Sequence, residues 1–303
     1  MSAPARVLCD WGSSRLRAYL DIEGRICERR DGPGINRLGA ELPARALAAV
    51  LASWRREHIP EVFLCGMAGS RHGLVEVPYV RAPATMEAWR RGGLRVRIGD
   101  FDATVAPGVQ ANNHRDVPDV MRGEETQIFG ALALDQELAA GNQLFVLPGT
   151  HSKWVQVRDG VIEHVQTFLT GELFDLLGRH SSLLRVGTDS GADDAGFKAG
   201  VRAGTRGDLA ASLFETRTAQ LVDGRSAGWA REFLSGLLIG TEMASMLGTG
   251  KFRSAPLTVI GEPELTAIYL RALTDHYFRA RVLDGENCVC EGLRLLAAAE
   301  RES

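Results

Sequence analysis

The alternation of hydrophobic and polar positions near the N-terminus predicts three short strands joined by tight turns. Apolar residues dominate Val7–Asp10 and Leu16–Ile22, and a third short segment covers Arg25–Arg29. The dipeptide Glu23-Gly24 separates the last two segments and is typical of a two-residue hairpin turn. The chain therefore opens with a predicted three-stranded meander.

The next part of the chain alternates between helical and extended patterns. Apolar residues recur at helical intervals in Pro43–Trp54, whereas Val62–Met67 reads as a buried strand. Leu94–Ile98 and Thr104–Val109 are further predicted strands. Gly123–Ala139 carries acidic residues in its first turn and apolar residues at helical spacing, so it predicts a long helix. This alternation indicates an α/β protein.

A second three-stranded pattern follows that helix and resembles the first. Strands are predicted at Leu144–Leu147, Trp154–Val157 and Val161–Phe168, with a turn at Asp159-Gly160. Both segments run in the same order: a buried strand, a turn with glycine and hydroxyl residues, a basic residue, a strand, an acidic-glycine turn and a strand. Unrelated meanders can look alike, but the shared turn chemistry favours an internal duplication.

The first turn of each copy is suited to binding phosphate. Backbone N–H groups of a glycine-containing turn can converge on an anion, and hydroxyl and cationic side chains add donors. The residues concerned are Gly12, Ser13 and Ser14 in the first copy and Gly149, Thr150, Ser152 and Lys153 in the second. The chain has no P-loop motif. Two such turns on two similar domains, facing each other across a cleft, could hold one nucleotide, and Asp10 could hold Mg²⁺ through water.

Composition narrows the classes of partner. The chain has 303 residues, 45% of them hydrophobic, which is enough for two domains. The net charge of -3 without basic runs argues against nucleic acid, and no signal peptide or membrane-spanning apolar stretch is found, so we expect a cytoplasmic protein. The five cysteines are odd in number and mostly lie in apolar runs; Cys288 and Cys290 lack the second pair of a zinc site.

Several longer motifs resemble the 2-dehydro-3-deoxygalactonokinases, a family of the sugar kinase, actin and Hsp70 superfamily. The resemblance runs in order over nearly the whole chain. It rests on DWGSSRLRAYL (Asp10–Leu20), GMAGSRHG (Gly66–Gly73), VMRGEETQIFGA (Val120–Ala131), LPGTHSKWVQV (Leu147–Val157), TGELFDLL (Thr170–Leu177) and FLSGLLIGTEMASM (Phe233–Met246).

This resemblance implies a fold and an activity. The expected fold is α/β, with two ribonuclease H-like (actin-like ATPase) domains and a nucleotide cleft between them. Residues 1–140 would carry the first phosphate loop and the acceptor site, and residues 141–303 the second phosphate loop and the adenosine site. The expected reaction is ATP-dependent phosphorylation of 2-dehydro-3-deoxy-D-galactonate to the 6-phosphate in galactonate and galactose catabolism.

The resemblance also implies nucleotide-binding roles. Asp10 would serve Mg²⁺ and the transferring phosphoryl group, and Gly12, Ser13 and Ser14 would form the first phosphate loop. The second loop would comprise Gly149, Thr150, His151, Ser152 and Lys153, where His151 could meet a phosphate or brace the turn. Gly261 would lie against adenosine. Gly236 and Gly240 would line the same pocket, or would instead serve close helix packing.

A sugar kinase also needs a group that deprotonates or orients the acceptor hydroxyl. Glu124 and Glu125 lie at a loop-to-helix junction, where related kinases place this carboxylate, and the sequence does not decide between them. Both glutamates could instead only favour the helix N-terminus. Asp116 and Asp119 are the alternatives for the base.

The acceptor carries a carboxylate and a keto group, so its pocket needs cationic and hydroxyl donors. The candidates are Arg17, Ser70, Arg71 and Arg122, although Arg17 and Arg71 could equally be solvated charges. Three alternatives remain open: a kinase of a related 2-keto-3-deoxy acid, a phosphohydrolase on the same fold, and a sugar-responsive regulator. The oligomeric state is also open, with a homodimer as one candidate.

Overall fold

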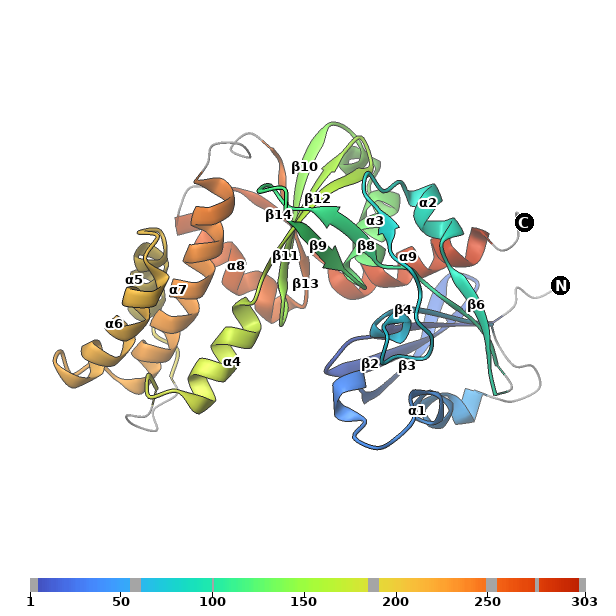
Figure 1. The fold of residues 1–303 in the computed structure, drawn as a ribbon, viewed down its shortest axis with the longest axis horizontal. Coiled ribbons are helices and arrows are strands. Elements are labelled where there is room, and N and C mark those ends of the chain that lie inside the picture. The colour runs from blue at the N-terminus through green and yellow to red at the C-terminus, as the bar shows by residue number, and fades with distance from the viewer. Residues whose placement is uncertain are drawn as a thin grey trace. The chain divides into compact units, whose positions relative to one another are not determined.

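The computed structural model describes residues 5–54, 61–99, 101–184, 191–248, 255–275 and 278–299. The chain divides into two compact units, which are described separately. Unit 1 comprises the described residues of Met1–Gln143, Val155–Gln166 and Leu283–Ser303, and unit 2 those of Leu144–Trp154 and Thr167–Val282. Figure 1 gives the labels of the elements.

Unit 1 contains a six-stranded sheet in the order β3-β2-β1-β4-β7-β6. Strand β1 pairs antiparallel with β2 and parallel with β4, so it lies inside the sheet. Its residues Val7, Leu8 and Cys9 are fully buried, as expected for a strand covered on both faces. The strands are β1 (Arg6–Trp11), β2 (Arg15–Ile22), β3 (Arg25–Pro33), β4 (Glu61–Gly66), β6 (Leu94–Ile98) and β7 (Phe101–Val105).

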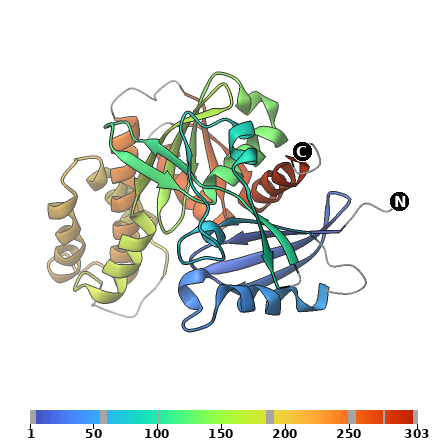
Figure 2. The same cartoon turned by 45° about the vertical axis from the view of Figure 1, so that its right-hand side comes forward.

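Two helices pack on this sheet. Helix α1 (Pro43–Leu51) joins Val7, Cys9 and Trp11 in one hydrophobic cluster. Helix α9 (Gly285–Ala299) contacts β1 and β4 and covers the opposite face (Figure 2). Its residue Arg294 pairs with Asp21 of β2. The sheet is therefore a rigid layer whose strand ends can position side chains.

Helix α3 (Glu124–Leu134) also belongs to unit 1 and crosses α9 at very short distance. A side chain at Gly130 would collide with the carbonyl oxygen of Cys288, so the crossing depends on glycine. Strand β8 pairs with β5, β9 and β12. The remaining elements are β5 (Val80–Arg81), α2 (Met86–Arg91), β8 (Val109–Asn112), β9 (Pro118–Met121) and β12 (Val161–Phe168).

Unit 2 is built on the strand order β14-β13-β10-β11, with β10 parallel to β13. Helix α7 is largely buried and packs against α5. The strands are β10 (Asn142–Leu147), β11 (Ser152–Arg158), β13 (Leu257–Gly261) and β14 (Ala280–Asp284), of which β10, β11 and β14 also contribute residues to unit 1. The helices are α4 (Thr170–His180), α5 (Asp194–Gly204), α6 (Leu209–Leu221), α7 (Ala227–Leu247) and α8 (Pro263–Asp275). None of the described helices is long and apolar enough to cross a membrane.

The two predicted meanders both form, and their hairpin turns share an unusual backbone. Glu23 and Gly24 have φ values of 54° and 79°, and Asp159 and Gly160 have values of 48° and 75°. Positive φ at both central residues is the geometry of a type I′ hairpin turn. The repeat seen in the sequence is thus also a repeat of backbone conformation.

Two predicted elements were wrong in extent. The helix expected over Gly123–Ala139 ends at Leu134, because Asp135 is extended and its side chain accepts a hydrogen bond from the backbone N–H of Glu137, capping a separate 3-10 turn. The strand expected over Thr104–Val109 is split between β7 and β8 at Pro107, whose nitrogen cannot donate to a sheet.

The compact units differ from the expected domains of 1–140 and 141–303. The first division lies nearby, at Gln143, but the residues from Leu283 onward group with unit 1. The physical reason is the packing of α9 on β1, β4 and α3. The C-terminal helix therefore supports the N-terminal sheet.

Candidate active site

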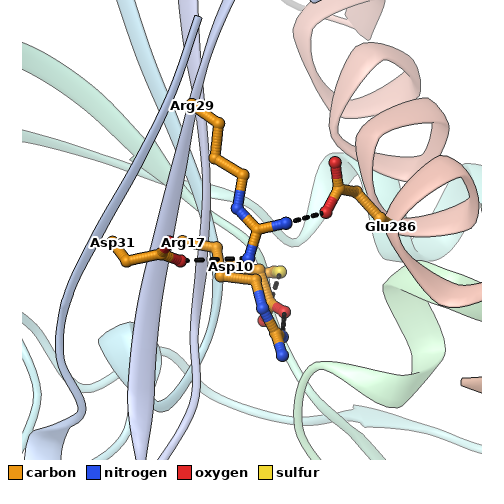
Figure 3. Close-up of polar contacts among 6 residues, drawn as sticks. Asp10, Arg17, Arg29, Asp31 and Glu286 are labelled. Carbon is orange, nitrogen blue, oxygen red and sulfur yellow. Dashed lines mark hydrogen bonds and ion pairs between the residues drawn. The ribbon is translucent and has the colours of Figure 1, made fainter. Parts of the chain in front are cut away.

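Asp10 lies at the carboxyl end of β1, beside Cys65 at the end of the parallel strand β4. Its Oδ2 atom is 3.2 Å from Nη1 of Arg17, which stands opposite it on β2. The Sγ of Cys65 donates to Oδ1 at 3.8 Å (Figure 3). The carboxyl ends of neighbouring parallel strands are a common place for ligand sites in α/β proteins.

The ionisation of Asp10 depends on opposing effects. Burial raises the pKa of its carboxyl, the nearby Arg17 guanidinium lowers it, and the negative charge of Glu124 raises it again. Arg17 was expected to be a substrate-binding residue or a solvated charge, and the structure places it as the ion-pair partner of Asp10. The effect of Glu124 shows that a second carboxylate lies in the same region.

A polar chain continues across the sheet from this pair. Asp31 stands opposite Arg17 in the β2–β3 register and pairs with Arg29 at 3.1 Å. Arg29 also pairs with Glu286 of α9 at 2.6 Å (Figure 3). Both pairs are exposed, so each contributes little to stability. Through the pair between Arg29 and Glu286, however, α9 contacts β3. This strand is the neighbour of β2, which carries Arg17.

The start of helix α3 lies against the end of β4. Gly123 has a φ of 115° and Gly66 a φ of 72°, which only glycine adopts easily. A Cβ atom on Gly123 would be 3.1 Å from the Cα of Gly66, and one on Gly66 would be 3.7 Å from Oδ1 of Asp10. The two glycines therefore let the helix carrying Glu124 begin close to Asp10.

The two adjacent glutamates occupy different environments. Glu125 is fully buried, and both of its carboxylate oxygens accept the N–H of Gly123 at 2.8 Å. Burial, and then the charge of Glu124, raise the pKa of Glu125 to about 8. Glu124 is only partly buried, and its Oε2 accepts the N–H of Arg122 at 3.1 Å. Only Glu124 thus combines some exposure with proximity to Asp10.

Glu125→Gln is expected to change how stability depends on pH. The folded protein holds a proton on Glu125 up to about pH 8, whereas the ordinary pKa of a glutamate side chain is 4.5. The wild type should therefore lose stability as the pH rises between those values, since folding then requires proton uptake. Relative to the wild type, the variant should gain on the order of 2 to 4 kcal/mol between pH 5 and pH 8. Urea unfolding at both pH values measures this, and an unchanged difference would contradict a protonated Glu125.

Arg122 is held beside the same helix start. Its Nη2 donates to the carbonyl of Val77 at 2.8 Å, and its guanidinium lies 4.2 Å from the centre of the Tyr79 ring. A Cβ on Gly69 would be 2.8 Å from its Nη1. Within the described part of the chain, the buried Nε and Nη1 atoms have no hydrogen-bond partner. Arg122 therefore has donors left for a ligand.

The other predicted acceptor residues are less constrained. The hydroxyl of Ser70 donates to the carbonyl of Met67 at 2.8 Å, and Arg71 is exposed.

Of the alternative bases, Asp116 accepts a hydrogen bond from the side chain of Asn112 at 2.7 Å, and Asp119 accepts the N–H of Val120. Asp116 lines an open cavity of about 500 Å³ on unit 1.

The first predicted phosphate turn is fixed by its own backbone. The N–H of Gly12 donates to the carbonyl of Arg15 at 2.8 Å, and the carbonyl of Ser13 accepts the N–H of Asn36 at 3.1 Å. The side chain of Ser14 is exposed and that of Ser13 partly so. These two backbone hydrogen bonds hold the loop, and the hydroxyls of Ser13 and Ser14 take no part in them.

The second predicted phosphate turn lies at the carboxyl end of β10 in unit 2. Thr150 and His151 are exposed, whereas Ser152 and Lys153 are buried. The Nε2 of His151 is 2.6 Å from Oε2 of Glu172, so the ring is braced against α4. At the end of the parallel strand β13, a Cβ on Gly261 would be 3.7 Å from Pro148. The predicted phosphate and adenosine segments are therefore neighbours.

Gly236 and Gly240 lie where α7 crosses α5. Side chains at these positions would collide with the carbonyl oxygens of Phe197 and Val201, respectively. Close helix packing, the alternative kept open from the sequence, accounts for both glycines. A contact between either glycine and nucleotide stays a prediction.

The fold places the chain in a known class. The activator of the 2-hydroxyisocaproyl-CoA dehydratase from Clostridium difficile, solved with bound ADPNP, superposes with a TM-score of 0.51 at 10% identity, covering 98% of this chain and 96% of that one. At that identity only the fold is comparable. The architecture is an α/β fold with two ribonuclease H-like domains, as the sequence predicted.

More similar proteins define the family. A model of the family described as 2-keto-3-deoxy-galactonokinase matches residues 10–296, and the chain belongs to this family. The 2-dehydro-3-deoxygalactonokinase of Escherichia coli (strain K12) is 37% identical over 297 residues, covering 97% of both chains. A probable 2-dehydro-3-deoxygalactonokinase of Rhizobium meliloti (strain 1021) is 37% identical over 302 residues, covering 96% of this chain and 95% of that one. The crystal structure of a putative 2-dehydro-3-deoxygalactonokinase from Sinorhizobium meliloti gives a TM-score of 0.88 at 33% identity, covering 97% and 96%.

Proposed function

We propose that this protein is an ATP-dependent kinase that converts 2-dehydro-3-deoxy-D-galactonate to its 6-phosphate in galactonate catabolism. The membership of the chain in the 2-keto-3-deoxy-galactonokinase family supports this activity. The observation that carries the mechanism is the proximity of two carboxylates, Asp10 at the carboxyl end of β1 and Glu124 at the start of α3, which lies against the end of β4.

Glu124 is the proposed base. The oxygen of the acceptor's terminal hydroxyl attacks the γ-phosphorus of ATP, the bond to the bridging oxygen of ADP breaks, and the hydroxyl proton passes to Glu124. Phosphoryl transfer depends mainly on positioning and charge stabilisation, so a base needs access to the acceptor rather than an unusual basicity. Glu124 is partly exposed, whereas the fully buried Glu125 holds the helix start by accepting the N–H of Gly123.

Asp10 is the proposed Mg²⁺ residue. Among the described residues, no group of three or more histidine, cysteine, aspartate or glutamate side chains could hold a metal ion by itself. This fits Mg²⁺, which is commonly held by one or two carboxylates together with water and substrate phosphates. When bound, the ion neutralises charge on the transferring phosphoryl group. Arg17 lowers the pKa of the Asp10 carboxyl against the effect of burial, and this favours the charged form that the role requires.

Arg122 is the proposed ligand of the acceptor's carboxylate. Its Nε and Nη1 atoms are buried and lack a partner within the part of the chain that the structure covers. Buried donors without a partner are costly, and an oxygen of a carboxylate would supply an acceptor for either of them, since Nε and Nη1 lie on different edges of the guanidinium. Ser70 and Arg71 are proposed as further contacts around the acceptor.

The turn Pro148–Lys153 is the proposed binding site for the phosphates of ATP. A Cβ on Gly149 would meet no atom closer than 3.9 Å, so the backbone here is open to a ligand, and Thr150 is exposed beside it. The first loop, with Gly12, Ser13 and Ser14, is proposed to contact the transferring phosphoryl group. We place the enzyme in the cytoplasm, since its cysteines are unpaired and four of the five are buried.

A coupled assay of ADP release with ATP and Mg²⁺ tests the proposal. The acceptors are 2-dehydro-3-deoxy-D-galactonate, the epimeric gluconate-derived acid and simple hexoses. We expect the highest kcat/KM with the galactonate-derived acid and no turnover of hexoses. Preference for the epimer would identify a kinase of a related acid, and ADP release without any acceptor would identify a phosphohydrolase; either result would overturn the proposed reaction.

A further inference from the structure

One buried carboxylate in unit 2 collects four hydrogen bonds. Glu242 lies in the C-terminal third of α7 and is 1% exposed. Its Oε2 accepts the hydroxyl of Ser152 at 3.0 Å and the indole N–H of Trp154 at 2.7 Å. Its Oε1 accepts the hydroxyls of Tyr269, at 2.8 Å, and of Thr170. Four donors match the capacity of an ionised carboxylate, although burial raises its pKa.

Two of these donors bracket the proposed phosphate turn. Ser152 closes the turn at the start of β11, and Thr170 is the first residue of α4. The start of α4 lies directly on the turn: the N–H of Glu172 donates to the carbonyl of Thr150 at 2.9 Å, and a side chain at Gly171 would collide with the carbonyl of Gly149. The carboxylate of Glu242 thus bonds to Ser152 of the turn and to Thr170 at the start of α4.

The hydroxyl of Ser152 therefore points inward. Ser152 was expected among the phosphate-binding residues, but its side chain is fully buried and donates to Glu242. Removing a carboxylate from water costs free energy, which the four hydrogen bonds offset. Through the bonds to Ser152 and Thr170, Glu242 therefore links the turn to the start of α4.

We infer that Glu242 is a positioning residue for nucleotide binding: by holding Ser152 and Thr170 together, it fixes the turn Pro148–Lys153 in the conformation that binds the phosphates of ATP. This inference rests on the proposed function of the turn. Glu242 itself does not contact nucleotide. Its loss should weaken the binding of nucleotide and leave the recognition of the sugar acid unchanged.

The test compares three variants of the full-length protein. Glu242→Gln keeps the shape of the side chain but leaves it with fewer hydrogen-bond acceptor sites. Thr170→Val removes the hydroxyl that donates to Oε1 of Glu242 from the start of α4, beside the turn. Tyr269→Phe removes the hydroxyl that donates to the same Oε1 atom from α8. Nucleotide affinity is measured by titration with the non-hydrolysable analogue β,γ-imido-ATP, and steady-state kinetics give KM for ATP and for the acceptor.

We expect Glu242→Gln to weaken analogue binding and to raise KM for ATP by about tenfold, the size expected when a hydrogen-bond acceptor that fixes the turn is lost. KM for the acceptor should stay at the wild-type value. Thr170→Val should show the same pattern more weakly, and it serves as the decisive variant if Glu242→Gln does not fold. Tyr269→Phe should lower thermal stability while retaining nucleotide affinity.

Two results would overturn the inference while the kinase assignment stands. One is wild-type analogue affinity in both Glu242→Gln and Thr170→Val. The other is an equal loss of affinity in Tyr269→Phe, which would indicate general loosening of unit 2. If the wild type itself binds no analogue and phosphorylates no sugar acid, the proposed function fails, and the inference fails with it.

Discussion

Glu124→Gln is expected to lower kcat by about 10² to 10⁴, the usual contribution of a positioned general base. The glutamine keeps the size of the side chain, and its amide oxygen can still accept the N–H of Arg122, so the start of α3 should remain ordered. KM for ATP should change little, because the proton is transferred only during the chemical step. Steady-state kinetics with saturating acceptor measure the effect.

The neighbouring Glu125→Gln variant is the matched control. It makes the same substitution one residue further along the helix, at a side chain that is fully buried. A carboxyl that is already protonated at neutral pH resembles the amide, so kcat should stay close to the wild-type value. A large loss of kcat in Glu125→Gln together with normal turnover in Glu124→Gln would reverse the two roles. Normal rates in both would move the base elsewhere, to Asp116 or Asp119.

Asp10→Asn is expected to lower kcat by about 10² to 10³, the range for removal of a group that stabilises transition-state charge. The substitution removes the carboxylate proposed for Mg²⁺ and breaks the ion pair between Asp10 and Arg17. It should therefore also lower the free energy of unfolding, by about 1 to 3 kcal/mol. Rates are compared at saturating ATP and over a range of Mg²⁺ concentrations.

Asp21→Asn separates the loss of stability from the loss of catalysis. Asp21 lies on the same sheet, is 2% exposed and pairs with Arg294 at 3.2 Å. Its replacement should destabilise the protein to a similar degree while kcat for the folded enzyme stays near the wild-type value. If both variants lose kcat equally, the effect of Asp10→Asn is structural and the metal role is wrong.

The strands and turns that carry the candidate site depend on local pattern, and the sequence predicted them. Asp10 was singled out because it ends a buried strand before a turn with glycine and hydroxyl residues, and the duplicated meander indicated the second turn; the roles of both stay predictions. The two hairpin turns, with their acidic and glycine residues, formed as expected. These features are set by neighbouring residues, so a single sequence is sufficient to predict them.

Features that depend on distant residues could not be predicted in the same way. Glu124 and Glu125 are adjacent, and their environments differ because Gly123 turns the helix start against Gly66 of another strand. The inward direction of Ser152 depends on Glu242, which is 90 positions further along the chain. A signal for Glu242 was present: it is the one charged residue in the segment Phe233–Met246.

The most direct test of the central claim is the balance between ATP consumed and sugar acid phosphorylated by the wild type. ADP is quantified enzymatically, and the product of 2-dehydro-3-deoxy-D-galactonate is identified by mass spectrometry and phosphorus NMR. A kinase of the proposed type should form one 6-phosphate for each ADP and should release almost no ADP without the acid. Phosphoryl transfer to the sugar acid would be contradicted if ADP were released at the same rate without the acid. It would also be contradicted if the γ-phosphate of ATP appeared as inorganic phosphate instead of as the sugar-acid phosphate.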